Sequence, residues 1–232
     1  MTTDIATAAE FHLTDWWDKN KKLVIQVVGV VAVVALVVSF YVWNKNKHEQ
    51  DAAEALSTVQ VTDGGAQSYV KVADDYSGTR AAARALLLAA GSEYANGKFA
   101  EAESLYQRFL KSSDDADWRP IALLGVATSL NAQGKKAEAV TRYQDFLQRY
   151  ANDPGAIAAK SALAHLYESQ SQFNQALDLY QEIGRSAQNT SYGLEAMVSL
   201  QNLTAAHPEL MEKLKAASAG APPSVTSPVT NN

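Results

Sequence analysis

The 232-residue sequence contains no cysteine and only six prolines, and each scarcity excludes certain kinds of site or fold. Without cysteine there are no disulfides, no thiolate nucleophiles and no zinc sites with sulfur ligands. Three of the six prolines fall in the last eleven residues, so the rest of the chain is almost free of the residue that most often breaks helices. Because alanine, the strongest helix former, is abundant, we expect an all-α fold.

Signatures of nucleic-acid binding and of catalysis are also missing. The formal net charge is −5, whereas nucleic-acid-binding surfaces carry clustered basic residues. The segment Asp63-Gly64-Gly65 lacks the lysine and the spacing of a phosphate-binding loop, and no G-x-S-x-G motif occurs. The acidic pairs Asp74-Asp75 and Asp114-Asp115 are better explained as helix caps and soluble loops than as catalytic carboxylates. We therefore expect a protein that is not an enzyme, needs no cofactor and binds no nucleic acid or small-molecule substrate.

A charge-free apolar run is the most prominent feature that the sequence does have. It extends over Leu23–Trp43, LVIQVVGVVAVVALVVSFYVW, and includes only Gln26 and Ser39 as polar side chains. About 20 such residues in an α-helix span the roughly 30 Å hydrocarbon core of a bilayer. The run therefore predicts a transmembrane helix.

Two other interpretations fit this run less well. A cleaved signal peptide usually has an apolar core of about 7–15 residues followed by a small-residue cleavage site, whereas this run is longer and ends without one. A buried core helix would need comparably apolar partners, which the rest of the chain lacks. Amphipathic aromatic residues at both ends, typical of membrane interfaces, favour a retained anchor: Trp16, Trp17, Tyr41 and Trp43.

The lysines around the run indicate its orientation. Lys19, Lys21 and Lys22 precede it, against Lys45 and Lys47 after it. By the positive-inside rule, the short arm of residues 1–22 lies in the cytoplasm and the body lies outside. We therefore predict a single-pass membrane protein with its body outside the cytoplasm, in the periplasm if the source is Gram-negative.

From residue 46 to residue 183 the sequence repeats with a period of 37 residues. Aromatic, aliphatic, small and turn positions all keep this spacing. The aligned positions are Tyr69, Tyr106, Tyr143 and Tyr180; Val72, Phe109, Phe146 and Ile183; Ala53, Ala90, Ala127 and Ala164; Ala102, Ala139 and Ala176; and Gly97, Gly134 and Ser171. Several columns at one spacing indicate an array of structural repeats.

Within one repeat, the apolar positions predict two antiparallel helices. In Pro120–Tyr150, two sets of apolar residues have the spacing of a helix face. The first set is Leu123, Val126, Ala127 and Leu130, and the second is Ala139, Tyr143, Phe146 and Leu147. Between the two sets, Gly134 suits the left-handed residue past a helix end. Because one hairpin cannot bury its own apolar face, stacked neighbours supply the core.

This pattern resembles the tetratricopeptide repeat (TPR), whose columns hold a small residue, a glycine, an aromatic, an alanine and a second aromatic. Residues 83–119 match with Ala90, Gly97, Phe99, Ala102 and Tyr106. Residues 120–156 have Lys136 in place of the first aromatic, residues 157–193 have Ser171 in place of the glycine, and the period exceeds the usual 34 or so. The resemblance implies a TPR-type α-solenoid over residues 83–193, preceded by a linker helix and a degenerate repeat at residues 44–82.

The end of the chain differs from the repeats. Ser191–Ala206 predicts a helix, and Pro208 opens a last short one. Residues 194–217 are therefore expected to form capping helices with one polar face, as the end of a solenoid requires. Residues 218–232 offer almost nothing to bury and are expected to be a disordered tail.

The resemblance also implies a protein-binding groove lined by the first helix of each repeat. The groove positions carry over to Arg84, Leu87, Gly91 and Tyr94; to Ile121, Leu124, Thr128 and Asn131; and to Ala158, Ser161, His165 and Glu168. The candidate binding residues among them are Arg84, Leu87, Tyr94, Leu124, Asn131, His165 and Glu168. Packing or solvation of the groove explains each of them equally well. Only Arg84 and Asn131 suit the carboxylate clamp of chaperone-tail-binding TPR proteins, so no such clamp is expected.

His165 and Glu168 are the nearest approach to a metal-ligand pair. Their i, i+3 spacing places both on one helix face. No further ligand stands out in the sequence, so we interpret them as a polar pair in the groove and expect no metal site.

The order of features resembles the YfgM-like family, ancillary single-span subunits of the bacterial Sec translocon. The shared layout is an acidic arm with paired tryptophans, the span Leu23–Trp43 followed by Asn44, an immediate helix, and repeat hairpins. It implies a single-pass protein of the bacterial inner membrane with a cytoplasmic N-terminus, a periplasmic TPR-like domain, and contacts with the translocon and periplasmic chaperones. We therefore expect a membrane-anchored scaffold linking the two.

Other functions remain open. Residues 137–154 also resemble periplasmic TPRs of envelope-assembly proteins, which are often lipoproteins, although this chain lacks the lipid-accepting cysteine. A role in envelope assembly is therefore one alternative. A regulatory or sensory role, with the N-terminal arm signalling inward, is another.

Overall fold

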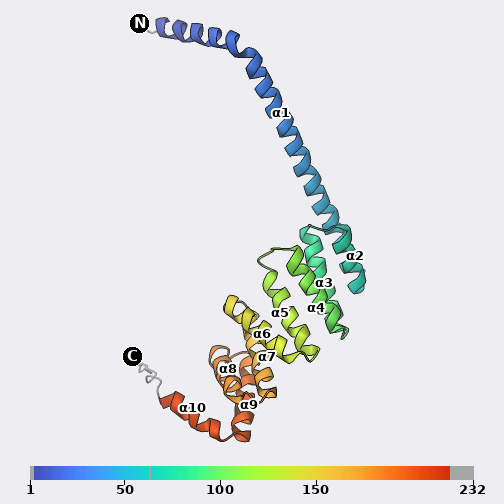
Figure 1. Ribbon diagram of the computed structural model, residues 1–232, viewed down its shortest axis with the longest axis vertical. Helices are drawn as coiled ribbons and strands as arrows, with labels where there is room; N and C mark the ends of the chain where they lie inside the picture. The colour runs from blue at the N-terminus through green and yellow to red at the C-terminus, as the bar shows by residue number, and fades with distance from the viewer. Residues whose placement is uncertain (1–2, 63, 220–232) are drawn as a thin grey trace, which may run out of the picture.

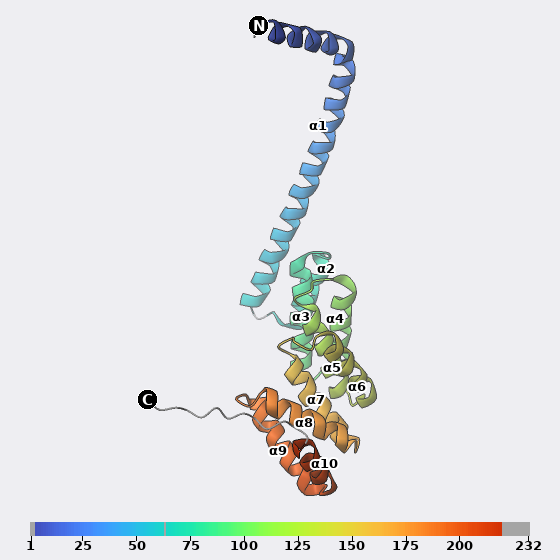
Figure 2. The same cartoon turned by 90° about the vertical axis from the view of Figure 1, so that its left-hand side faces the viewer.

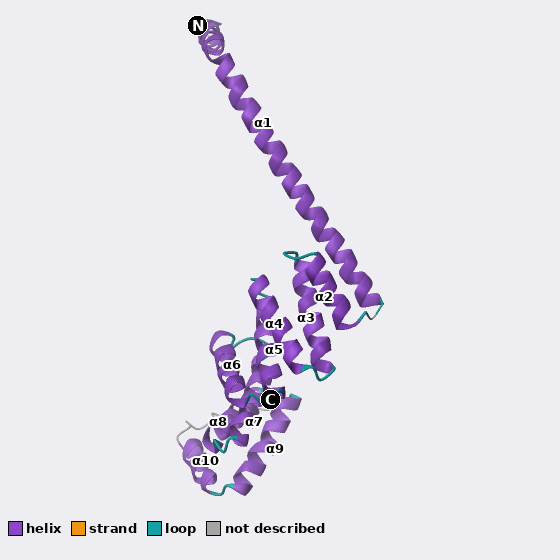
Figure 3. Cartoon of the chain, turned by 45° about the vertical axis from the view of Figure 1, so that its right-hand side comes forward, coloured by secondary structure: helices purple, strands orange, loops and turns teal. Residues whose placement is uncertain are grey.

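In the computed structural model, residues 3–62 and 64–219 are described, and every regular element in them is an α-helix. Helix α1 projects from one end of an elongated molecule, and the shorter helices α2–α10 stack beyond it (Figure 1). The described residues contain no strand (Figure 3). The prediction of an all-α fold with one long apolar N-terminal helix is confirmed.

Helix α1 (Thr3–Val61) contains the apolar run and extends it in both directions. The arm before the run is helical from Thr3 onward, and its first turns bend away from the rest of α1 (Figure 2). After Trp43 the helix continues unbroken to Val61, as expected for a helix that joins the run to the first hairpin.

The apolar side chains of α1 face outward along the run. Leu36, for example, keeps 69% of its surface exposed. In the described part of the chain, only the segment Trp16–Val61 is long and apolar enough to cross a membrane, with a mean hydropathy of 2.9 over its best window and none of that window buried.

Beyond α1 the helices form antiparallel hairpins, each packed on its neighbour in chain order (Figures 1 and 3). Helix α2 (Gly65–Asp75) lies against the last turns of α1. The next three hairpins are α3 (Arg80–Ala95) with α4 (Phe99–Ser112), α5 (Arg119–Ala132) with α6 (Lys136–Arg149), and α7 (Ala156–Ser169) with α8 (Phe173–Ser186).

The turn within each of these three hairpins uses one left-handed residue. Gly97 and Gly134 have φ of 77° and 76°, a conformation that costs glycine nothing. Ser171 adopts the same conformation, with φ of 60°, at the position that the repeat alignment gives to glycine. The backbone of the turn is therefore kept although the third repeat has lost its glycine.

Alanines let the two helices of a hairpin approach closely. Ala90, Ala102, Ala127 and Ala139 are fully buried, as are Ala164 and Ala176 in the last repeat. Ala53 is the exception, because it is exposed while its neighbour Ala52 is fully buried. Burial in α1 is therefore shifted by one residue from the aligned alanine position, because no earlier repeat covers that side of the helix.

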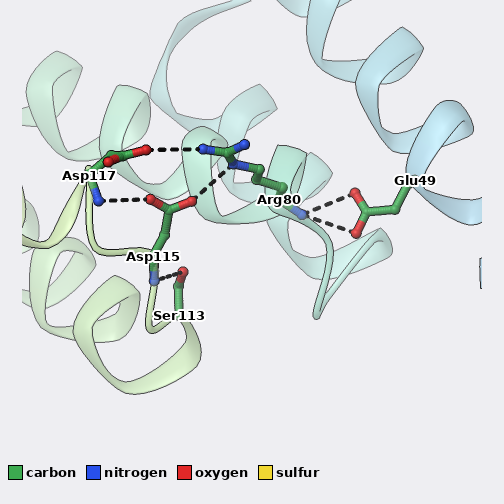
Figure 4. A network of polar contacts seen from close by, with 5 residues as sticks. All are labelled: Glu49, Arg80, Ser113, Asp115 and Asp117. Atoms are coloured by element: carbon green, nitrogen blue, oxygen red, sulfur yellow. Dashed lines mark hydrogen bonds and ion pairs between the residues drawn. The ribbon is translucent and has the colours of Figure 1, made fainter. Parts of the chain in front are cut away.

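A polar network fixes α1 to the repeats (Figure 4). The Glu49 carboxylate on α1 accepts hydrogen bonds of 3.1 and 3.3 Å from the backbone N–H of Arg80, at the start of α3. The Arg80 guanidinium in turn binds Asp115 at 2.9 Å and Asp117 at 3.5 Å, in the loop between α4 and α5, and lies 5.0 Å from the Trp118 ring centre. One residue therefore joins three segments.

Two further helices close the array. In α9 (Ser191–Ala206) Leu203 is buried, and in α10 (Glu209–Ala219) so is Leu210. Leu194, Met197 and Val198 are nevertheless exposed, so α9 has an apolar outer face where a polar one was predicted. Residues 220–232 of the predicted disordered tail lie outside the described residues.

Candidate functional site

The first helices of successive hairpins, α3, α5 and α7, carry the predicted groove positions. Between α3 and α5 the chain forms a hollow of about 590 Å³. Tyr94 lines it from α3, Ile121, Leu124 and Thr128 line it from α5, and Tyr106 enters it from α4. Ile121 keeps 54% of its surface exposed, so the apolar wall of the hollow is open to a partner.

The rim of the hollow is acidic. Asp117, from the loop between α4 and α5, lies at one side, and Asp153, between α6 and α7, lies at another. The Asp153 carboxylate accepts a 2.7 Å hydrogen bond from the Gly155 N–H, which holds this loop against the hollow. Asp117 already pairs with Arg80, so Asp153 is the rim carboxylate that, beside the apolar wall, favours a peptide with an apolar side chain next to a basic one.

A glycine inside a helix gives the hollow its shape. A Cβ at Gly125 of α5 would lie 2.5 Å from two ring atoms of Tyr106, so the absence of a side chain lets the ring rest on the helix backbone. Burial raises the pKa of the Tyr106 phenol, with a smaller contribution from Tyr94. The ring therefore forms a neutral floor at physiological pH.

The structure brings two of the predicted binding residues into this hollow, Tyr94 and Leu124. The Tyr94 ring is also supported by Phe99, with 5.1 Å between ring centres. Arg84, Leu87 and Asn131 do not line it. Arg84 is exposed and Asn131 is half-buried, whereas Leu87 packs against the first core cluster, which is formed by buried residues of α1 to α5.

His165 and Glu168 lie in a separate cluster around Tyr180. The Tyr180 hydroxyl is 2.8 Å from His165 Nδ1 and donates a 2.8 Å hydrogen bond to Glu168. His165 Nε2 lies 3.2 Å from Glu195 of α9. Burial, followed by the hydrogen bond to Glu168, raises the pKa of Tyr180 strongly. These contacts join α7, α8 and α9.

Two of the aligned tyrosines reach from the second helix of a hairpin to the first helix of the same hairpin. Tyr143, almost fully buried, reaches from α6 to Thr128 on the groove face, with 3.4 Å between the two hydroxyl oxygens. Tyr180 makes the corresponding contact with His165, and each of these residues lies 37 positions after its counterpart in the Tyr143–Thr128 pair. Burial raises the pKa of Tyr143 as well.

Asp117, Asp153, Tyr106 and Gly125 were not among the residues that the sequence predicted for the groove. The two aspartates come from loops, where the 37-residue period gives no direction for a side chain. Gly125 did leave a signal, because a glycine inside a helical pattern often marks a close approach of another group. In the part of the chain that is described, no group of three His, Asp or Glu side chains is arranged to hold a metal ion.

Comparison with known proteins identifies relatives of this architecture. The family model for a tetratricopeptide repeat-like domain matches residues 14–151, from before the apolar run to just past α6. No curated protein matches the chain in sequence.

Among solved structures, a kinesin light chain from Podosopora anserina with nearly identical TPR-like repeats aligns with a TM-score of 0.52 and 18% identity, covering 75% of this chain and 94% of its own. A variant of that protein with one substituted residue aligns with a TM-score of 0.53 at the same identity, covering 75% and 92%. At this identity the likeness concerns the fold alone.

Proposed function

Because the chain belongs to the family of tetratricopeptide repeat-like domains, we propose that it is a membrane-anchored scaffold that holds other proteins in the hollow between α3 and α5. Repeats of this kind generally serve protein–protein interaction and not catalysis. The observation that carries the proposal is the hollow itself, with its exposed Ile121, its tyrosine floor and its two rim carboxylates. An extended segment with an apolar and a basic side chain suits it best.

Two observations support the membrane anchor. Apart from the half-buried Val24, the large apolar side chains of Leu23–Trp43 are exposed, which is unfavourable in water by roughly 25 cal/mol per Å² of apolar surface. The family match begins at residue 14, so the run belongs to the same unit as the repeats. The flanking lysines support a cytoplasmic N-terminus and a body outside the cytoplasm.

The partners that we propose are subunits of the Sec translocon and periplasmic chaperones. Support comes from the order of features, in which a short arm, a single span and an immediate helix precede the repeats. Continuity of α1 from the run to the first hairpin would hold the hollow at a fixed distance from the membrane, where chains emerging from a translocon first need a partner.

The binding role is tested by photo-crosslinking in intact membranes. A photoreactive amino acid in place of Ile121 should give crosslinked products containing translocon or chaperone subunits. When the partners are instead recovered by pull-down after membrane solubilisation, Ile121→Asp places a charge in the apolar wall that meets the partner's apolar side chain and should reduce their recovery roughly tenfold. Leu194→Asp is the matched control, because Leu194 is similarly exposed, at 63% against 54% for Ile121, but lies on α9 outside the hollow. Equal recovery from both variants would reject the hollow as the binding site.

The location is tested separately with a reporter fused at Asn232. We expect a reporter that is active only outside the cytoplasm to be active there. Activity of a cytoplasmic reporter at the same position would reject the periplasmic role, while leaving a scaffold function at the other side of the membrane.

A further inference from the structure

A second hollow lies on the other side of α5, between α4 and α6. Its volume is about 300 Å³, at the lower end of the roughly 300–1,000 Å³ range of ligand sites. Leu123 and Val126 of α5 contribute to its apolar lining, together with Leu110 of α4 and Phe146 of α6. A space of this size accommodates one large apolar side chain.

The rim of this second hollow is basic, in contrast to the acidic rim of the first. Lys111 lies on the α4 side, and Arg142 and Arg149 lie on the α6 side. Asp145 is the one carboxylate in the lining, so the hollow carries three positive charges against one negative charge, in a chain whose net charge is −5. The local field therefore favours an anion.

These three cations also differ from most others in the repeats. Lys71 pairs with Asp75, Lys98 with Glu93, and Lys160 with Glu182. Arg108, one position from Gln107 of the same lining, pairs with Asp74. Among the described residues, none forms an ion pair with the cations of the second hollow.

We propose that the hollow between α4 and α6 binds an acidic peptide segment of a partner protein. One large apolar side chain of the segment enters the hollow over Phe146, and carboxylates on either side of it meet Arg142 and Arg149. A guanidinium is weakly hydrated and binds a carboxylate through two parallel hydrogen bonds, so two arginines on one helix suit such a segment. The scaffold then offers two binding faces of opposite charge.

A protein segment fits this position better than a lipid headgroup. Residues 44–61 continue α1 beyond the apolar run and, as a helix, extend about 27 Å. Helix α6 lies beyond the end of α1 in both views (Figures 1 and 2). For a chain anchored by Leu23–Trp43, α6, which carries Arg142 and Arg149, therefore lies farther from the apolar run than the last turn of α1 does.

The test uses the purified full-length chain in detergent and fluorescence polarisation with three labelled peptides. One peptide alternates glutamate with phenylalanine, and the other two carry glutamine or lysine in place of glutamate. We expect the glutamate peptide to bind roughly tenfold more tightly than the glutamine peptide. Arg142→Glu with Arg149→Glu should weaken binding of the glutamate peptide at least roughly tenfold, because attraction becomes repulsion.

The controls separate charge from folding and from the first hollow. Both arginines are exposed, so the double variant should stay folded, and it should gain affinity for the lysine peptide. Arg185→Glu, which reverses an exposed arginine on α8, and Ile121→Asp should leave binding of the glutamate peptide within about twofold.

Two results would overturn the proposal. One is equal binding of the glutamate and glutamine peptides, or unchanged binding by the double variant. The other is that the parent chain binds vesicles of anionic phospholipid, the double variant does not, and the glutamate peptide binds neither protein. That result would assign the cations to a lipid surface instead.

Discussion

At the scale of single residues, the backbone conformation of the turn is kept from repeat to repeat even where the residue type changes. Gly97, Gly134 and Ser171 occupy equivalent turns with nearly the same φ, yet one of them carries a side chain. A left-handed conformation costs an L-residue about 1–2 kcal/mol. The third repeat therefore bears a local strain that packing of α7 against α8 outweighs.

Restoring glycine at this turn should stabilise the protein. We expect Ser171→Gly to raise the free energy of unfolding by about 0.5–1 kcal/mol, because relief of the left-handed strain exceeds the added freedom of glycine in the unfolded chain. Gly134→Ala is the reciprocal control: a Cβ there meets no atom within 4 Å, so a loss of about 1 kcal/mol would come from the backbone alone. Urea unfolding followed by circular dichroism measures both. Destabilisation by Ser171→Gly would contradict this account of the turn.

The buried tyrosines give the stability a dependence on alkaline pH. Burial raises the pKa of Tyr106, Tyr143 and Tyr180, so their phenols stay protonated in the folded chain at a pH where they ionise in the unfolded one. Their contribution is complete below about pH 10, the ordinary tyrosine pKa, and is lost as pH rises through the higher folded values.

Tyr143→Phe should therefore be nearly neutral at pH 7, because the hydroxyl makes only a 3.4 Å contact with Thr128, and should become relatively stabilising above pH 10. Denaturant unfolding of both proteins at several pH values measures the difference. A constant difference across the range would contradict the prediction.

At the scale of helices, the shape of the groove depends on how α4 packs against α5. The Tyr106 ring occupies the space that a side chain at Gly125 would need, and both residues line the hollow. A change at Gly125 therefore alters the spacing of the two helices as well as the floor on which a partner would rest.

Gly125→Ala should test this packing. The methyl group would overlap the Tyr106 ring, and overpacking of this kind costs about 1–3 kcal/mol, more than alanine gains by its helix propensity. Gly91→Ala is the control, because Gly91 lies in α3 with no atom near a Cβ and should gain about 0.5–1 kcal/mol. Thermal unfolding distinguishes the two. If Gly125→Ala is also stabilising, the ring moves freely and Gly125 does not shape the hollow.

At the scale of the whole molecule, the sequence predicted the structural features that recur in every repeat and missed the contacts that occur only once. The 37-residue period predicted the hairpins, and Gly97 and Gly134 predicted their turns, because a stacked array imposes the same packing at every step. Asp117 and Asp153 lie in loops, and the Arg80 network joins α1 to a loop 35 residues beyond Arg80, so no periodicity could place them. Ala52 is buried in place of the aligned Ala53 for a related reason, since the first hairpin has a neighbour on one side only.

The long helix and the repeats should behave as one rigid body because α1 contributes to the core. Ala52 and Leu56 of α1 are buried in the first core cluster, and Glu49 holds the start of α3. Leu56→Ala removes a buried side chain at a cost of about 2–5 kcal/mol, and we expect it to detach the last turns of α1 from α2 and α3 while α4–α8 stay folded. The angle between anchor and groove would then vary.

Because the chain has no cysteine, spin labels can be introduced without removing native thiols. Labels at Asn44→Cys on α1 and Asn189→Cys between α8 and α9 should give a narrow distance distribution in the parent chain and a broad one with Leu56→Ala. Val61→Ala, at a position that is 87% exposed, should leave the distribution narrow. A broad distribution in the parent chain would mean that α1 is a flexible tether, and a fixed height of the groove above the membrane would then be ruled out.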